Sequence, residues 1–245
     1  MSGHSKWATI KHKKAATDAK RGSLFTKVIK EITVAARNGG NPDTNPRLRV
    51  AIERAKEASM PADNIDRAIK KGTGQLEGVT YEDITLEGYG PGGVAIYVEG
   101  VSDNKNRTTA EVRTIFTKKG GNMAGAGSVA WMFEKKGYIV VSKKTIDEDK
   151  LMGIALDAGA EDLIVEDENY AVKTSTQDFF KVKKAIDDAG IKTEDAEITL
   201  LPKSTVKLAG DDAKKVLDLV EAIEEHEDIQ HVYANFDIPD ELLKE

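Results

Sequence analysis

Residues 137–201 have the sequence GYIVVSKKTIDEDKLMGIALDAGAEDLIVEDENYAVKTSTQDFFKVKKAIDDAGIKTEDAEITLL. Four runs in this stretch are rich in β-branched, aromatic and other apolar residues and predict strands: YIVVS (138–142), DLIVE (162–166), YAVKTS (170–175) and AEITL (196–200). Apolar residues at helical spacing predict helices over 147–158 and 177–189. The order strand–helix–strand–strand–helix–strand is typical of a ferredoxin-like βαββαβ domain, which we predict over 137–201.

The segments on either side of this unit predict a second, mixed domain. Upstream, Ile84 and Leu86 alternate with polar residues, GVAIYVEGV (93–101) predicts a strand, and another strand is expected at 129–133. Downstream, the pattern predicts a strand (205–208), a helix with apolar Val216, Leu217, Val220 and Ile223, and a strand (230–236). Three elements are too few for an independent sheet, so we expect them to complete the sheet begun at 81–133. The prediction is a discontinuous α/β domain, 80–136 and 202–245, interrupted by an acidic inserted domain at 137–201.

The first 79 residues predict a basic helical domain. Leu24, Phe25, Val28, Ile29 and Ile32 form the stripe of an amphipathic helix, which the glycines and proline of Asn38–Pro42 end. A second helix carries Leu48, Ala51, Ile52 and Ala55, and a third begins near Pro61 and ends at Gly72. Residues 8–20 also have a helical stripe, but it is nearly all alanine and buries little area. The predicted fold class is an α+β multidomain protein.

The upstream half of the mixed domain contains one further helix. Thr108 and Glu111 have the spacing of a capping box, so we expect the helix to begin at Thr108. Its predicted end is Lys118-Lys119-Gly120-Gly121, where cations in the last turn are followed by glycine.

Composition excludes several classes of protein. The chain has 245 residues, 40% of them hydrophobic and 32% charged, which is ordinary for a globular protein. Its lack of cysteine excludes a disulfide scaffold, a zinc ribbon, an iron–sulfur cluster and a thiol nucleophile. No apolar run reaches the roughly 18 residues of a membrane span, and the basic N-terminus lacks the apolar stretch of a secretory signal. We therefore expect a cytoplasmic location and no membrane partner.

Three motifs have chemical interpretations that the sequence does not favour. GYGPGG (88–93) precedes a strand rather than a helix, so a turn is favoured over a phosphate-binding loop. A Walker sequence is missing, which excludes a P-loop nucleoside triphosphatase. His226 and His231, if helical, lie about 140° apart around the axis and cannot share a metal. We expect no metal, no cofactor, no small-molecule substrate and no enzymatic activity.

Charge is distributed unevenly along the chain. The net charge is +9 over residues 1–75, −1 over 76–142 and −14 over 143–245. Lysines on an accessible segment can neutralise phosphates, and an aromatic side chain can stack on an unpaired base. The alternative is a solvated basic surface with Trp7 used in packing. The predicted nucleic-acid contacts are Lys6, Trp7, Lys11, His12, Lys13, Lys14, Lys20, Arg21, Lys27, Lys105, Arg107, Lys118 and Lys119.

Five segments together resemble the YebC family, which includes the mitochondrial translational activator of cytochrome c oxidase. They are MSGHSKWATIKHKKAATDAKRGSLFTKVIKEI (1–32), NPRLRVAIERAKEASMPADNIDRAIKKG (45–72), GYGPGG (88–93), NKNRT (104–108) and KKGGNMAGAGSVAWMF (118–133). The resemblance implies a three-domain α/β architecture and a non-enzymatic role in gene expression. The resemblance is consistent with two such roles. Many members are described as DNA-binding transcriptional regulators, and others support ribosomal elongation through stretches such as consecutive prolines.

Physical arguments favour the ribosome. A DNA regulator reads base edges or deformability, and the sequence shows no groove-reading motif. A factor docking on folded ribosomal RNA can use lysines for phosphates and glycine loops for close approach, although these loops are also consistent with ordinary turns. The expected functional loops contain Gly90, Pro91, Gly92, Gly93, Asn122 and Met123. Two alternatives stay open: a DNA-binding regulator, and a protein-interaction module whose acidic insert contacts a basic partner such as a ribosomal protein.

Overall fold

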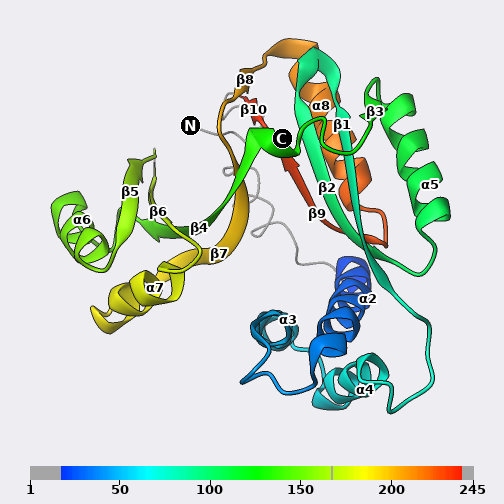
Figure 1. The fold of residues 1–245 in the computed structure, drawn as a ribbon. Coiled ribbons are helices and arrows are strands. Elements are labelled where there is room, and N and C mark those ends of the chain that lie inside the picture. The colour runs from blue at the N-terminus through cyan, green and yellow to red at the C-terminus, as the bar shows by residue number, and fades with distance from the viewer. Residues whose placement is uncertain (1–17, 167, 239–245) are drawn as a thin grey trace.

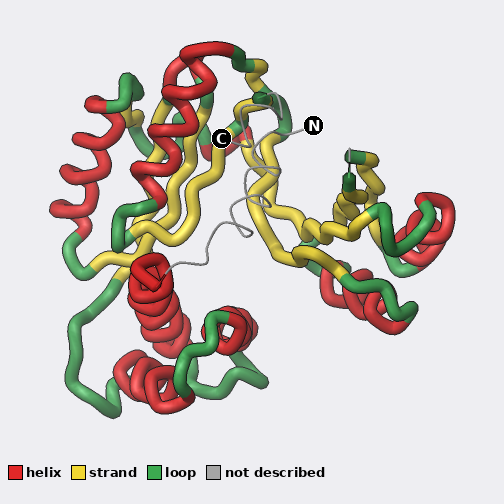
Figure 2. The backbone as a smooth tube through the Cα atoms, turned by 180° about the vertical axis from the view of Figure 1, so that it is seen from behind, coloured by secondary structure: helices red, strands yellow, loops and turns green. Residues whose placement is uncertain are grey.

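The computed structural model describes residues 18–166 and 168–238, which form a group of helices and two larger sheets (Figure 1). Antiparallel pairing predominates in both sheets, and each sheet carries two helices on one face (Figure 2). The fold is thus mixed α/β with a helical N-terminal region. Within the described residues, every helix is too short or too polar to span a bilayer.

Three helices make up the N-terminal region: α2 (Asp18–Ala35), α3 (Pro46–Glu57) and α4 (Ala62–Gly72), with a short η1 (Ala36–Asn38) after α2. Their apolar stripes meet as predicted, and Ile32, Leu48 and Ala51 are fully buried. The buried Asn45 fixes the turn before α3. Its side chain accepts the Leu48 N–H and donates to the carbonyls of Ala35 and Gly39, so a single amide caps one helix and satisfies the end of another.

The first sheet has the strand order β3-β1-β2-β9. Its strands are β1 (Glu82–Tyr89), β2 (Ala95–Ser102), β3 (Asn122–Ala124) and β9 (Ile229–Ala234). The helices α5 (Lys105–Lys118) and α8 (Gly210–Glu224) cover one face and share a core that includes Phe116, Leu219 and Ile223. The turn between β1 and β2 contains η2 (Pro91–Gly93), which confirms that GYGPGG forms a hairpin turn.

The second sheet has the order β5-β6-β4-β7. Along the chain its elements are β4 (Phe133–Ser142), α6 (Glu148–Asp157), β5 (Ala160–Val165), β6 (Asn169–Thr174), α7 (Phe179–Asp188) and β7 (Thr193–Pro202). Both helices pack on one face around residues such as Val141, Leu151 and Ile186. The predicted order of strands and helices is confirmed for this stretch.

The two sheets meet through their long strands and an aromatic cluster. β4 and β7 pair from Phe133↔Pro202 onward. On the face of the first sheet away from α5 and α8, Phe133 and Tyr233 are buried against Tyr97. The Tyr97 ring centroid lies 6.1 Å from that of Phe133 and 6.3 Å from that of Tyr233, within the range of aromatic contacts. The second sheet therefore contacts the first through this apolar cluster, at the end where β4 begins and β7 ends.

Several expectations are wrong in detail. Residues 130–132 form η3 (Ala130–Met132) rather than a strand, and β4 begins only at Phe133. The predicted 230–236 strand is broken at Asn235, whose side-chain oxygen accepts the Ala95 N–H. After this break, β10 (Phe236–Asp237) pairs with β8 (Val206–Lys207) in a separate two-stranded sheet, so β8 does not join the first sheet as expected.

The start of α5 also differs from the prediction. The helix begins at Lys105, and the Asn104 side chain caps it by accepting the Arg107 N–H. Thr108 is fully buried inside the first turns, where its hydroxyl donates to Asp228 at 2.6 Å. Thr108 therefore does not cap the helix, although its spacing from Glu111 matches a capping box. Its hydroxyl instead bonds to a carboxylate that is distant in sequence.

Asp228 connects three parts of the chain that are far apart in sequence. Its carboxylate is fully buried and accepts hydrogen bonds from Lys30 of α2 at 2.6 Å, and from Ser102, Arg107 and Thr108 around the start of α5. Burial by itself raises the pKa of Asp228, but the hydrogen bonds from Lys30, Thr108 and Arg107 outweigh it and hold the pKa well below its usual range. The helical region is thus attached to the first sheet through a buried ion pair.

We predict that Asp228→Asn lowers the free energy of unfolding by about 3–5 kcal/mol, because Lys30 would stay buried without its counter-charge. Urea unfolding measures this change. Asp83→Asn is the matched control: it breaks the exposed Arg47–Asp83 pair, and we expect a loss of about 1 kcal/mol or less.

The same carboxylate predicts a pH dependence. Because the folded pKa lies below the unfolded value, the ionised Asp228 contributes fully above about pH 4, and its contribution declines as pH falls toward the folded pKa. The stability difference between wild type and Asp228→Asn should therefore shrink below about pH 4. A difference that stays constant down to pH 2.5 would show that the ion pair does not stabilise the fold.

Candidate nucleic-acid interface

The predicted contact residues fall into three groups in the structure. Lys6, Trp7, Lys11, His12, Lys13 and Lys14 lie outside the described residues. Lys20 and Arg21 belong to the first turn of α2 by backbone, and the arrangement of their side chains is outside the description too. The remaining five, Lys27, Lys105, Arg107, Lys118 and Lys119, have described side chains.

Three of these five cations are bound within the protein. The Lys27 Nζ donates to the carbonyl oxygen of Glu224 at 2.6 Å, across the joint between α2 and the end of α8. Lys105 pairs with Glu82 at 2.9 Å, and Arg107 pairs with both Asp103 and Asp228. The carboxylates of Asp103 and Asp228 raise the pKa of Arg107, with Asp228 the larger cause, so it stays charged. These side chains support the fold whether or not a ligand also contacts them.

Lys118 and Lys119 differ from these three. Both are exposed at the C-terminal end of α5, and within the described part of the chain neither forms a salt bridge. The chain then turns through Gly120 with φ +79° and enters β3, where Asn122 pairs with Tyr89 and Met123 with Gly88. A Cβ at Gly121 would lie 2.8 Å from the Tyr89 carbonyl oxygen, so this approach requires glycine.

The two predicted functional loops lie side by side because β3 pairs with the end of β1. Gly90, Pro91, Gly92 and Gly93 form the hairpin turn at one side of this pairing, and Asn122 and Met123 lie in β3 itself. Gly92 has φ +70°, and a Cβ there would lie 2.5 Å from Leu208. The hairpin turn is therefore packed at Gly92 against the segment before α8. The neighbouring 125–131 loop is more open than this turn.

Glu87 holds the 125–131 loop from inside the protein. This buried carboxylate on β1 accepts backbone N–H bonds from Gly127 at 2.7 Å, Val129 at 2.6 Å and Ala130 at 3.0 Å. Burial by itself raises the pKa of Glu87, but these three hydrogen bonds outweigh it and lower the pKa below its usual value. A buried ionised side chain that satisfies three loop amides fixes the loop conformation in the absence of any ligand.

Two exposed aromatic side chains bond to this loop, one from the end of β1 and one from η3, and no sequence pattern indicated them. The Tyr89 hydroxyl and the Trp131 indole N–H both donate to the carbonyl oxygen of Ser128, each at 3.1 Å. Trp131 is 66% exposed and Tyr89 36% exposed. Lys203 adds a cation, because its Nζ donates to the Trp131 carbonyl oxygen at 2.8 Å. We call Tyr89, Lys118, Lys119, Trp131 and Lys203 the loop surface.

The two C-terminal histidines do not lie on one helix. His226 follows α8, accepts the Asp228 N–H at Nδ1 and contacts Glu111 through Nε2 at 2.9 Å. His231 lies in β9, stacks on Tyr233 and contacts Arg54 at 3.2 Å. Each histidine has its own partners, and the described residues contain no group of three or more side chains arranged to bind a metal.

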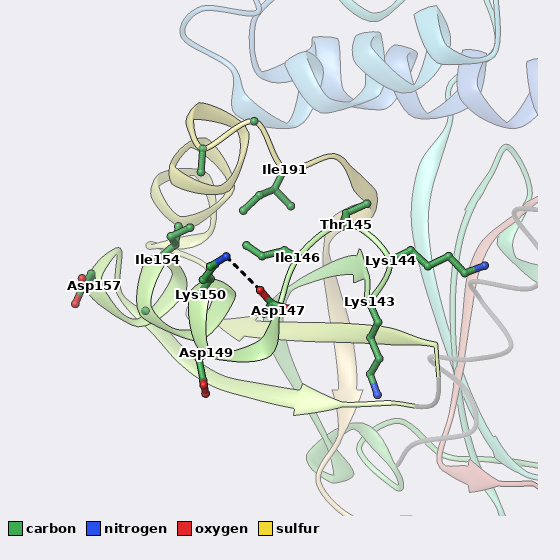
Figure 3. Close-up of a pocket in the computed structure, with 13 residues that line it drawn as sticks. Lys143, Lys144, Thr145, Ile146, Asp147, Asp149, Lys150, Ile154, Asp157 and Ile191 are labelled. Atoms are coloured by element: carbon green, nitrogen blue, oxygen red, sulfur yellow. Dashed lines mark ion pairs between the residues drawn. The ribbon is translucent and has the colours of Figure 1, made fainter.

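A shallow depression lies in the second sheet's region, between α6 and the end of α7 (Figure 3). Lys143, Lys144 and Lys150 line it together with Asp147, Asp149 and Asp157, so its charge is mixed. Lys150 pairs with Asp147 at 3.2 Å, and both side chains are largely exposed. Its helix α6 lies far from α5 (Figure 1), and the chemistry of the depression favours no single ligand.

We predict that Glu87→Gln lowers the free energy of unfolding by about 1–3 kcal/mol, because the new NH₂ group must face loop N–H donors that need an acceptor. Amide hydrogen exchange at Gly127, Val129 and Ala130 should accelerate by more than the global change explains. Glu82→Gln on the same strand is the control, since its pair with Lys105 is exposed. Unchanged exchange at the three amides would contradict the assigned role of Glu87.

Comparison with known proteins agrees with this architecture along the whole chain. A relative from Dictyoglomus turgidum named "Probable transcriptional regulatory protein" is 58% identical over 246 residues, covering 100% of this chain and 99% of the relative. A relative of similar name from Geobacter sulfurreducens is 57% identical over 245 residues, with 100% and 99% covered. The crystal structure of a conserved hypothetical protein from Aquifex aeolicus matches with a TM-score of 0.79 and 50% identity, covering 91% of this chain and 92% of that one.

Family models match two regions. The TACO1/YebC protein N-terminal domain matches residues 5–75, and the TACO1/YebC second and third domain matches residues 81–236. These matches include the helical region, both sheets and the loop surface described above. Since they extend over most of the sequence, the chain belongs to the TACO1/YebC family.

Proposed function

We propose that this protein is a non-enzymatic, cytoplasmic regulator of gene expression that binds ribosomal RNA and supports elongation through difficult sequences such as consecutive prolines. The observation that carries the proposal is the loop surface. In it Lys203 contacts Trp131 on the loop that Glu87 holds, Tyr89 bonds to the same loop, and Lys118 and Lys119 are exposed just before the strand that pairs with Tyr89. The names of the relatives, which refer to transcriptional regulation, support a role in gene expression.

The shape of the loop surface favours folded RNA over duplex DNA. Its aromatic side chains lie at the end of strand β1 and in the 3₁₀ turn η3, and its lysines lie at a helix end and after a strand. None of these elements presents a helix face of the kind that reads a major groove. RNA recognition, in contrast, uses splayed bases that stack on aromatic side chains while cations contact the backbone.

The acidic part of the chain adds a second argument. Residues 133–202 have 10 lysines and 16 acidic residues, and Figure 1 shows their helices α6 and α7 far from α5. A polyanion bound at α5 therefore lies away from these acidic side chains. We propose that 137–201 is a ferredoxin-like inserted domain that keeps this charge apart from the bound RNA, supported by its strand order β5-β6-β4-β7.

Two other functions have specific observations in their favour. A DNA-binding transcriptional regulator is favoured by the names of the relatives. A protein-interaction module is favoured by the acidic surface, which suits a basic partner such as a ribosomal protein. Deletion of 137–201 distinguishes the protein-interaction module from the main proposal. If the deletion variant still binds nucleic acid but has lost its function, the inserted segment makes a protein contact.

The test of the main proposal is sedimentation of cell lysate through a sucrose gradient at two salt concentrations. We expect the protein to migrate with ribosomes at low salt and to be released at high salt, because phosphate contacts weaken as counterions compete. Migration with free proteins at both concentrations, together with recovery of the protein on promoter DNA, would overturn the proposal in favour of transcription.

We predict that Lys118→Ala combined with Lys119→Ala weakens ribosome binding and lowers the slope of log affinity against log salt by about 1.4, since each lost phosphate contact contributes about 0.7 on single strands. Lys183→Ala with Lys184→Ala is the control, because these α7 lysines are paired with Asp187 and Asp188. An unchanged salt slope in the first variant would remove these two lysines from the interface.

The N-terminal basic segment generates a separate prediction. Replacing Lys11, Lys13 and Lys14 with alanine should weaken co-sedimentation with ribosomes, because three cations available to phosphates are lost. Quantitative co-sedimentation at low salt measures the change. Full binding by this variant would exclude the segment from RNA contact and leave the loop surface as the proposed site.

A further inference from the structure

We infer that Tyr89 and Trp131 form a preformed stacking platform for an unpaired base of single-stranded RNA, whose phosphates then lie toward Lys203 and the Lys118–Lys119 pair. The inference rests on the proposed function and makes it specific: it names the RNA feature that the loop surface recognises. It follows from how the two rings are held, what the loop amides are bound to, and where the charges lie.

The two rings share one anchor. The Tyr89 hydroxyl comes from the end of β1 and the Trp131 indole N–H from η3, yet both donate to the Ser128 carbonyl oxygen at 3.1 Å. Their polar edges are therefore turned toward the loop and toward each other. A base stacks on the face of a ring, so these hydrogen bonds restrain the rings without using the surfaces that bind.

The anchor itself is fixed. Ser128 lies between Gly127 and Val129, and both of these donate their backbone N–H to the buried Glu87. The rings are consequently ordered before a ligand arrives, which reduces the conformational entropy lost on binding. An ordered aromatic pair at the surface is costly to maintain unless something covers it, and 66% exposure is unusual for a tryptophan.

The same hydrogen bonds exclude another interpretation of the glycine-rich loop. Successive backbone amides in such loops often bind anions, but here the N–H groups of Gly127, Val129 and Ala130 point inward to Glu87. The loop backbone is thus unsuited to a phosphate. The loop backbone is open at Gly125 and Gly127, because a Cβ at either position would meet nothing within 4 Å.

Positive charge lies beside the platform and at the end of the neighbouring helix. Lys203 lies directly beside Trp131, held by the bond from its Nζ to the Trp131 carbonyl oxygen. Lys118 and Lys119 end α5, a few residues before the point where β3 pairs with Tyr89. Stacking surface between cations suits a nucleotide better than an apolar peptide, because a peptide offers no phosphate to the lysines. Duplex RNA keeps its bases paired and stacked, so it lacks the group that the platform accepts.

The experiment uses the full chain with Trp7→Phe, which leaves Trp131 as the single tryptophan. Titration with a single-stranded oligoribonucleotide should quench the Trp131 fluorescence, since a stacked base quenches indole. Duplex RNA of the same length should quench less and bind more weakly at equal salt. Equal quenching by both RNAs would overturn the stacking inference, because it would show that unpaired bases are not required.

Substitutions provide an independent measurement by fluorescence polarisation of labelled RNA. We expect Trp131→Ala to bind single-stranded RNA about 5- to 150-fold more weakly and Trp131→Phe to retain most of the affinity, since it keeps a ring that can stack. Phe180→Ala is the matched control, because Phe180 is 50% exposed but lies on α7, away from the loop surface. Thermal unfolding of each variant verifies that the fold is intact.

The failures of the two proposals are distinguishable. If wild type co-sediments with ribosomes and binds RNA, but Trp131→Ala has the same affinity and the single tryptophan is not quenched, the platform is refuted and the proposed function stands. If wild type binds neither ribosomes nor RNA at low salt, the proposed function itself fails, and the platform with it. Weaker binding by Trp131→Ala with wild-type affinity in Phe180→Ala supports both.

Discussion

The buried carboxylate of Asp228 is the constraint on which the arrangement of the N-terminal half depends. It accepts Lys30 from α2 and Arg107 and Thr108 from α5, so two helices take their positions from one side chain in the turn before β9. A buried charge with unsatisfied oxygens is strongly unfavourable, and each donor is therefore required. The helical region, the start of α5 and the turn before the edge strand β9 are therefore held together by one side chain.

A second buried carboxylate, Glu87, applies the same principle to the loop surface. Three backbone amides of the 125–131 loop are satisfied from inside, which leaves the exterior of the loop to aromatic rings and lysines. Because Glu87 is part of a β-strand within a packed sheet, the loop inherits the rigidity of that sheet. Binding sites held in this way lose little flexibility on binding. The proposed RNA contact is thus a consequence of how β1 and β3 pair.

The junction between the two sheets determines where the acidic charge lies. The second sheet is joined to the first where β4 begins and β7 ends, through the apolar cluster that includes Phe133, Tyr97 and Tyr233. α6 and α7 lie on the side of the molecule remote from α5 (Figure 1). This separation keeps the 16 acidic residues and 10 lysines of residues 133–202 away from the lysines at the end of α5.

The sequence by itself determined the helices and strands whose apolar residues repeat at a regular period, including the order of the elements from β4 to β7 and the hairpin at GYGPGG. It did not determine features that depend on distant partners. Thr108 resembles a cap but serves Asp228, and Arg107 resembles a free cation but is paired with that same residue. Trp131 and Tyr89 became a candidate site only when folding brought them to one carbonyl oxygen. The period of apolar residues in a segment indicates which of its side chains are buried. The partner of a buried charge or of an exposed ring depends instead on tertiary contacts between residues far apart in the chain.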